Sequence, residues 1–280
     1  MLKLNKNFLQ RLFFGALLVG VIVLCILWQA KSFAILFALI SALSTREYHT
    51  LMIRQGVSVS TDWGSIGSLF LFLGFYGYFA PCVVAWFSPL FLSFFGFWFV
   101  ISFIVELYNK TSKPLVNLSY LVLGQIYVAL PFALLSGLYF YGGQPTPVLV
   151  LALFVLIWTN DTFAYMTGSL FGKHRLFERI SPKKSWEGFI GGNVFALAVS
   201  QIFAYYEPAI SWWMWLVFAQ FVVLSATYGD LIESLIKRNL AVKDSGQAIP
   251  GHGGFLDRFD SVLLASPVLF IILTLLQLFK

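Results

Sequence analysis

Charged residues are scarce in this chain. Only 11% of the 280 residues are Asp, Glu, Lys or Arg, whereas 59% are hydrophobic. A soluble domain usually carries about 25% charged residues, so this composition excludes an ordinary soluble fold. Apolar runs close to 20 residues long, roughly the length that crosses a bilayer, recur along the whole chain instead. The sequence therefore predicts an integral membrane protein made of helices.

Cysteine is scarce too, and several nucleotide-binding and catalytic motifs are missing. The only two cysteines, Cys25 and Cys82, fall in or beside different apolar runs. Neither has a Cys or His partner at metal-ligand spacing, which excludes a disulfide framework and a zinc site. The chain contains neither G-x-x-x-x-G-K-[ST] nor G-x-S-x-G, so a P-loop and a hydrolase elbow are also excluded.

The apolar runs predict an all-α, polytopic protein with about nine transmembrane helices. These spans are expected near residues 11–29, 32–44, 64–83, 88–106, 115–140, 147–166, 188–206, 211–236 and 261–279. If the N-terminus is cytoplasmic, 16 of the 18 basic residues lie on the cytoplasmic side, and only Lys31 and Lys280 lie outside. The positive-inside rule therefore predicts a cytoplasmic N-terminus and an external C-terminus.

The polar residues are concentrated late in the chain. We expect one integral membrane domain, residues 1–280, with scaffold helices in 1–145, a catalytic half in 146–261 and a last transmembrane helix at 262–280. No internal repeat is present, although repeats are frequent in transporters.

The first polar group is Asp161, at the inner end of the expected span 147–166. A carboxylate at the centre of a membrane helix costs about 2.5–3.5 kcal/mol. Asp161 therefore either reaches water at the interface or faces a wet cavity that takes a metal or a nucleotide. Further on, Gly188 and Gly192 form a G-x-x-x-G pattern that predicts close helix packing.

The second group is Ser181-Pro182-Lys183-Lys184. Ser181 and Pro182 are typical of an N-cap and a first helical position, which would put both lysines in the first turn of the span 188–206. Lysine is unfavourable at a helix N-terminus, but a bound phosphate chain would favour it there. The alternative is that the two lysines only mark the inner face of the membrane.

The third group ends the span 211–236. It comprises Asp230, Glu233, Ser234, Lys237 and Arg238. Their spacing of i, i+3, i+4, i+7 and i+8 places all five on one helical face. An internal salt bridge from Asp230 or Glu233 to Lys237 is one interpretation, and a ligand site that continues into the next segment is the other.

That next segment, up to Asp260, is a polar island in an apolar chain. Gly253 and Gly254 permit tight approach of backbone amides to a ligand. Asp257 and Asp260, spaced i, i+3 at the start of the last helix, can face one cation. Mg²⁺ prefers such oxygen ligands and usually binds one or two carboxylates together with substrate phosphates.

These residues resemble the signature of the phosphatidate cytidylyltransferases, also called CDP-diacylglycerol synthases. The matching residues are Ser234, Lys237-Arg238, Lys243-Asp244, Gly246, Pro250, His252-Gly253-Gly254 and Asp257-Arg258-Phe259-Asp260. Upstream, Asp161-Thr162, Ala164-Tyr165, Phe171-Gly172-Lys173, Ser181 to Ser185 and Glu187-Gly188 also match, although the family more often has Thr where Ser185 stands. The N-terminal half matches only in its hydropathy and weakly at Glu47-Tyr48.

The resemblance implies an enzyme that condenses CTP with phosphatidate to give CDP-diacylglycerol and pyrophosphate. It also implies a requirement for Mg²⁺, with a second cation left open, and metal ligands at Asp230, Asp257 and Asp260. The catalytic residues are then expected to be Asp230, Asp257, Lys237, Arg238, Lys243, His252 and Arg258. The substrate-binding residues are expected to be Lys183, Lys184, Ser181, Asp161, Ser234, Gly253 and Gly254.

Two alternatives remain at this point: a CTP-dependent lipid kinase, which would release CDP, and an anion transporter. The expected location is the cell inner membrane, with several passes through the bilayer and an active site that faces the cytoplasm. The expected partners are the two substrates and the bilayer. A homodimer is left open, and no nucleic acid is expected to bind.

Overall fold

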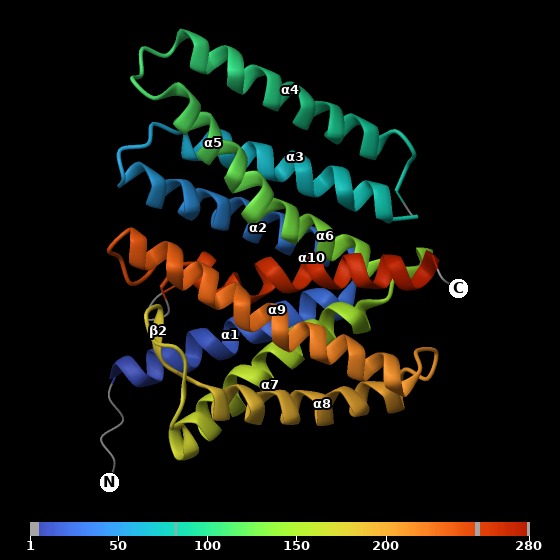
Figure 1. Ribbon diagram of the computed structural model, residues 1–280. Helices are drawn as coiled ribbons and strands as arrows, with labels where there is room; N and C mark the ends of the chain where they lie inside the picture. Colours follow the sequence, from blue (N-terminus) through green and yellow to red (C-terminus); the bar gives the residue numbers. More distant parts are fainter. Residues whose placement is uncertain (1–5, 82, 250–252, 279–280) are drawn as a thin grey trace. The chain divides into compact units, whose positions relative to one another are not determined.

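The protein is described by a computed structural model over residues 6–81, 83–249 and 253–278, and most of these residues are helical (Figure 1). The helices are α1 (Lys6–Trp28), α2 (Ala30–Ile53), α3 (Thr61–Phe79), α4 (Phe87–Tyr108), α5 (Pro114–Gly124), α6 (Leu130–Tyr139), α7 (Pro147–Phe171), α8 (Trp186–Tyr206), α9 (Trp212–Asn239) and α10 (Leu256–Leu278). The π-helical turn η1 (Gln125–Ala129) joins α5 to α6, and the 3-10 turn η2 (Tyr141–Gly143) follows α6.

Within the described ranges, six helical segments are long and apolar enough to cross a membrane. They are Phe87–Tyr108, Pro114–Gly143, Pro147–Phe171, Trp186–Tyr206, Trp212–Asn239 and Leu256–Gln277. The prediction of an α-helical, multi-pass membrane protein is therefore confirmed. The predicted number of nine spans and the predicted orientation stay predictions.

The chain forms two compact units that alternate along the sequence. Unit 1 comprises Met1–Pro147 and Val242–Phe259, and unit 2 comprises Val148–Ala241 and Asp260–Lys280. Helix α10 thus begins in unit 1 and continues in unit 2. The division into a scaffold half and a catalytic half stays a prediction.

In unit 1, α3 packs against both α2 and α4. Aromatic side chains fill the core: the Phe33 and Tyr139 rings stack with their centroids 4.3 Å apart. The Phe132 ring on α6 meets the Phe259 ring edge to face at 5.6 Å. Because this geometry favours aromatic pairs beyond their buried area, Phe259, late in the chain, is held against the early helix α6.

In unit 2, small residues bring α7 and α8 together. A Cβ atom added to Gly192 would lie 2.6 Å from the Asn160 Oδ1 atom, and one added to Gly188 would lie 2.7 Å from the Ala164 carbonyl oxygen. Real side chains cannot approach so closely, so both positions require glycine at this crossing. The prediction that Gly188 and Gly192 pack helices is confirmed.

A two-stranded hairpin between α7 and α8 was not predicted. Strand β1 (Arg175–Phe177) pairs antiparallel with β2 (Ser181–Ser185). The expected helix start at Ser181 is therefore wrong, because the ladder with β1 holds that stretch extended. Helix α8 begins at Trp186, and the Ser185 hydroxyl caps it by accepting a hydrogen bond from the Gly188 amide at 3.1 Å.

Candidate functional site

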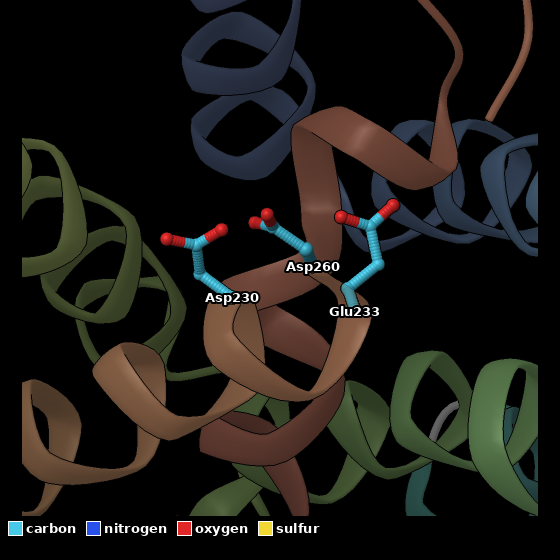
Figure 2. A group of neighbouring side chains, drawn as sticks. All are labelled: Asp230, Glu233 and Asp260. Atoms are coloured by element: carbon cyan, nitrogen blue, oxygen red, sulfur yellow. The ribbon is translucent and has the colours of Figure 1, made fainter. Parts of the chain in front are cut away.

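Three carboxylates converge in unit 2. Asp230 and Glu233 come from α9 and Asp260 from α10, and one oxygen of each lies within 4.8 Å of the other two. Figure 2 shows the Asp230 and Asp260 carboxyl groups pointing toward one another, and their side chains share a hydrogen bond. We call Asp230, Glu233 and Asp260 the acidic cluster.

A glycine beside Asp230 allows this convergence. A Cβ atom on Gly229 would lie 2.7 Å from the Asp260 carbonyl oxygen and 3.2 Å from the Ser261 Cα atom. Only a residue without a side chain lets the backbones of α9 and α10 come this close. The two aspartates therefore face each other because their helices cross at Gly229.

Lysines accompany the acidic cluster. The Lys184 ammonium group forms an ion pair with Asp230, and the Lys237 ammonium group forms one with Glu233. The Glu233 side chain is only 1% exposed, so its charge requires the lysine or another cation nearby. The interpretation of an internal ion pair is thus confirmed for Glu233 and Lys237, and Glu233 also joins a group that could bind a metal.

Lys184 reaches Asp230 from a strand, which corrects its predicted place in the first turn of a helix. Successive side chains of a strand point to opposite faces. On β2, accordingly, Lys183 is exposed while Lys184 is half-buried beside the acidic cluster.

Asp161 and Ser234 lie near the same aspartate. The Asp161 carboxylate on α7 interacts electrostatically with Lys184 and Asp230. The Ser234 hydroxyl donates a long hydrogen bond, 3.4 Å, to Asp230 Oδ1. Predicted site residues on α7, β2, α9 and α10 therefore lie together in unit 2.

A second polar group belongs to unit 1 and surrounds Asp257. Its Oδ2 atom accepts hydrogen bonds from the Ser245 amide at 2.8 Å, the Ser245 hydroxyl at 2.9 Å and the Gly254 amide at 2.9 Å. Gly253 has a φ of +84°, a conformation that glycine adopts without strain. A Cβ atom at Gly253 would also lie 2.8 Å from Asp257 Oδ2.

Glu47 on α2 completes this group. Its Oε2 atom accepts hydrogen bonds from the Leu256 amide at 2.9 Å and from the Ser245 hydroxyl at 3.3 Å. We call Glu47, Ser245, Gly254 and Asp257 the loop cluster. The sequence offered only the weak Glu47-Tyr48 match, and the long separation along the chain hid this contact.

Glu47 also explains two glycines of the signature. A Cβ atom on Gly246 would lie 2.7 Å from Glu47 Oε1, and one on Gly254 would overlap Glu47 Oε2. The glutamate therefore occupies the space that side chains at these two positions would need.

The other predicted site residues differ in their exposure to solvent. Ser181 is half-buried on β2, and Arg238, Lys243 and Arg258 are exposed. His252 lies outside the described residues. The roles assigned to all of these positions stay predictions.

The donor set of the acidic cluster suits a hard divalent cation. Carboxylate oxygens are the ligands that Mg²⁺ prefers, and Mg²⁺ commonly completes its coordination with water and phosphate oxygens. Three carboxylates this close repel one another, and a cation or a shared proton relieves that repulsion.

Together, the apolar helices and this cluster define a multi-pass membrane protein with a polar site suited to a cation and phosphate groups. Residues 9–276 match the cytidylyltransferase family, and the chain belongs to that family. The resemblance predicted from the sequence is confirmed.

The chain is similar to proteins named phosphatidate cytidylyltransferase from three staphylococci. It is 37% identical over 177 residues to that of Staphylococcus haemolyticus, which is 61% of this chain and 66% of the relative. It is 38% identical over 177 residues to that of Staphylococcus aureus, with the same coverage. It is 43% identical over 125 residues to that of Staphylococcus saprophyticus, 44% of this chain and 48% of the relative. The chain thus spans about two thirds or less of the length of these relatives.

Proposed function

We propose that this protein transfers the cytidylyl group of CTP to phosphatidate and so forms CDP-diacylglycerol and pyrophosphate for phospholipid biosynthesis. The observation that carries the proposal is the acidic cluster with Lys184 beside Asp230. Family membership and the names of the relatives support the same substrates.

In the proposed reaction, a phosphate oxygen of phosphatidate attacks the α-phosphorus of CTP. The bond from that phosphorus to the oxygen of the β-phosphate breaks, and pyrophosphate leaves with the bonding electrons. A phosphomonoester is already largely ionised near neutral pH, so no general base is required. The protein then acts mainly by positioning two anions and neutralising their charge.

Asp230, Glu233 and Asp260 would hold Mg²⁺, and Asp257 stays a predicted ligand whose Oδ2 atom already has three hydrogen-bond donors. When bound, the cation supplies charge neutralisation to the phosphate groups. A second cation is left open.

The basic residues of the chain hold the substrates in this proposal. Lys184 and Lys237 already lie beside carboxylates, and their flexible stems allow their ammonium groups to bind phosphate oxygens as well. The exposed bases Lys183, Arg238, Lys243 and Arg258 are assigned to the triphosphate and the lipid phosphate together. Ser181, Ser234 and Asp161 orient these groups.

Glu47 is a positioning residue in this proposal. It hydrogen-bonds the first residue of α10 and the Ser245 hydroxyl, and so fixes the signature segment that carries Asp257. Gly253 and Gly254 stay predicted substrate-binding residues, although the Gly254 amide already donates to Asp257. His252 stays a predicted catalytic residue.

We further propose nine spans with a cytoplasmic N-terminus. α5, η1 and α6 then count as one span, and each remaining long helix counts as another. In this proposed orientation the site faces the cytoplasm at the inner membrane of the cell, and the distribution of basic residues supports it. Helix α4 exposes Phe97, Leu107 and Tyr108, which fits contact with lipid or with a second copy in a homodimer.

The decisive experiment is incubation of the purified protein with CTP, phosphatidate and Mg²⁺. We expect CDP-diacylglycerol and pyrophosphate as products, and no turnover after a chelator removes divalent cations. Release of CDP with a phosphorylated lipid would establish the lipid kinase instead. Flux of an anion into proteoliposomes without nucleotide turnover would establish a transporter.

A further inference from the structure

Unit 1 contains a pocket that uses none of the residues assigned to the cytidylyltransferase reaction. Its volume is about 330 Å³, which is within the range of small-molecule sites. The loop before α3, the first turn of α3, the end of α4 and the start of α5 form its walls.

One end of this pocket is polar and is organised around Glu106. The Glu106 carboxylate accepts hydrogen bonds from Asn117 Nδ2 at 2.7 Å, Thr111 Oγ1 at 2.8 Å and Asn109 Nδ2 at 3.1 Å. The Asn117 side-chain oxygen Oδ1 accepts a hydrogen bond from the Ser58 amide at 2.9 Å. These contacts fix the direction of the carboxylate, so the polar end is organised before any ligand binds.

The negative charge at this end has only neutral partners. All three groups that donate to Glu106 are amides or a hydroxyl, and in the described part of the chain no basic side chain forms an ion pair with it. Glu106 is only 7% exposed. A carboxylate that has no basic partner attracts a cation that enters the pocket beside it.

The remaining walls are apolar and aromatic. Ile101, Val105, Leu118 and Leu121 line the pocket together with Trp63. The Trp63 ring is held by a hydrogen bond from its Nε1 to the Ser102 hydroxyl at 2.8 Å, and it stacks on Trp98 with centroids 6.2 Å apart. Tryptophan is the side chain that attracts organic cations most strongly.

We propose that this pocket binds an organic ammonium ion that carries an apolar chain. The ammonium group pairs with Glu106, and the chain lies along the aliphatic walls. Two sources share this chemistry, namely the amine headgroup of a membrane lipid and a soluble alkylamine. The rival explanation is that the Glu106 contacts only fasten the turn between α4 and α5.

Equilibrium binding of radiolabelled decylamine to the full-length protein in a non-ionic detergent tests the proposal without CTP or phosphatidate. We expect saturable binding that decanol does not displace. Glu106→Gln keeps the shape of the side chain but removes its charge, and should weaken binding at least about tenfold, the scale of a charge-assisted hydrogen bond. Equal affinity in the variant, or equal displacement by decanol, would overturn the proposal.

Two further variants keep the test decisive. Val105→Trp fills the pocket and leaves the Glu106 contacts in place, so it should also weaken binding at least about tenfold, a loss of about 1.4 kcal/mol. Unchanged binding in that variant contradicts the proposal even if Glu106→Gln does not fold. Asp62→Asn is the matched control and should leave decylamine binding unchanged, because the Asp62 side chain is 75% exposed and pairs with Arg46.

Competition then separates the two sources. Displacement of decylamine by phosphatidylethanolamine, but not by phosphatidylglycerol, assigns the pocket to an amine-bearing lipid. Displacement only by unlabelled decylamine assigns it to a soluble amine. Both results support an ammonium site, whereas equal displacement by both lipids contradicts it.

Discussion

Asp230 in unit 2 and Asp257 in unit 1 are both predicted metal ligands, but their carboxylates have different partners. Asp230 faces two other carboxylates and one lysine. The Oδ2 atom of Asp257 faces two backbone amides and one hydroxyl. The first arrangement gathers three carboxylates, whereas the second surrounds two carboxylates, Asp257 and Glu47, with backbone and hydroxyl donors.

This difference separates two tasks, binding of a cation and positioning of a loop, that the sequence motifs do not distinguish. A carboxylate among other carboxylates is stabilised by a cation, so the acidic cluster should respond strongly to Mg²⁺. A carboxylate that accepts three hydrogen bonds from its own loop stabilises that loop with or without a cation. The comparison thus predicts binding by the acidic cluster and positioning by the loop cluster.

The largest expected effect comes from the acidic cluster. Asp230→Asn or Asp260→Asn should lower the rate of liponucleotide formation at least about 1000-fold, equivalent to about 4 kcal/mol. Each change removes a negatively charged metal ligand from a cluster of only three carboxylates. Turnover is measured on protein that is still folded and inserted in the membrane. Near-normal activity would remove the substituted residue from the metal site.

Asp257→Asn sharpens the comparison. We expect it to abolish most turnover, by about 100-fold or about 2.7 kcal/mol, because a neutral side-chain amide holds the loop's donors less strongly than a carboxylate does. Calorimetric titration with Mg²⁺ should nevertheless give a smaller change in affinity than Asp230→Asn gives. An equal loss of Mg²⁺ affinity in both variants would make Asp257 a metal ligand and erase the difference.

Glu47 and Gly246 test whether the loop cluster acts by positioning. Gly246→Ala should reduce turnover about tenfold, because the added Cβ atom meets only atoms of Glu47 among its three nearest neighbours. Glu47→Ala should reduce turnover about 10- to 100-fold.

A double-mutant cycle supplies the control for this pair. In the Glu47→Ala background the clash is gone, so Gly246→Ala should add little further loss. Additive losses would show that the two residues act separately. A loss confined to kcat, with KM for CTP unchanged, distinguishes positioning of the reacting groups from loss of substrate binding.

Much of this picture could be predicted from the sequence. Apolar runs located the long helices, and the i, i+3, i+4 spacing placed Asp230, Glu233 and Lys237 on one face. Glu233 was nevertheless not predicted as a candidate ligand, because the resemblance implied ligands at Asp230, Asp257 and Asp260. Only the crossing of α9 and α10 at Gly229 brings it close to Asp260.

Two other features depend on contacts that local patterns do not encode. Ser181-Pro182 has the chemistry of a helix start, but pairing with Arg175–Phe177 makes the stretch a strand. Glu47 hydrogen-bonds a residue 209 positions away. No periodicity connects residues at that separation, so only the fold of unit 1 reveals the contact.

A smaller effect, on the stability of the fold, is expected at Gly192, which packs two helices of unit 2 together. Gly192→Ala should lower the free energy of unfolding by about 1–3 kcal/mol, because its Cβ atom would overlap the Asn160 side chain and backbone. Thermal unfolding in detergent measures this loss. Gly96→Ala is the control, since no atom lies within 4 Å of a Cβ atom there, and it should leave stability unchanged or slightly raised. Equal behaviour of the two variants would contradict the close crossing of α7 and α8.

The smallest expected effect is that of Lys110→Ala, which tests whether positive charge alone explains the role of the lysines. Lys110 is exposed and follows the end of α4 in unit 1. Like Lys184 it is predicted to lie on the cytoplasmic side, but it belongs to neither the acidic cluster nor the loop cluster. If the lysines acted only through the electrostatic attraction of anions to the membrane surface, the two alanine variants would lose similar activity, because a surface charge contributes wherever it lies within a screening length.

We expect Lys110→Ala to change turnover less than about twofold, and Lys184→Ala to reduce it at least about tenfold, since only Lys184 is paired with Asp230. Equal losses of activity in the two variants at low salt, both abolished at high salt, would place the effect in the overall field of the protein and remove Lys184 from the site.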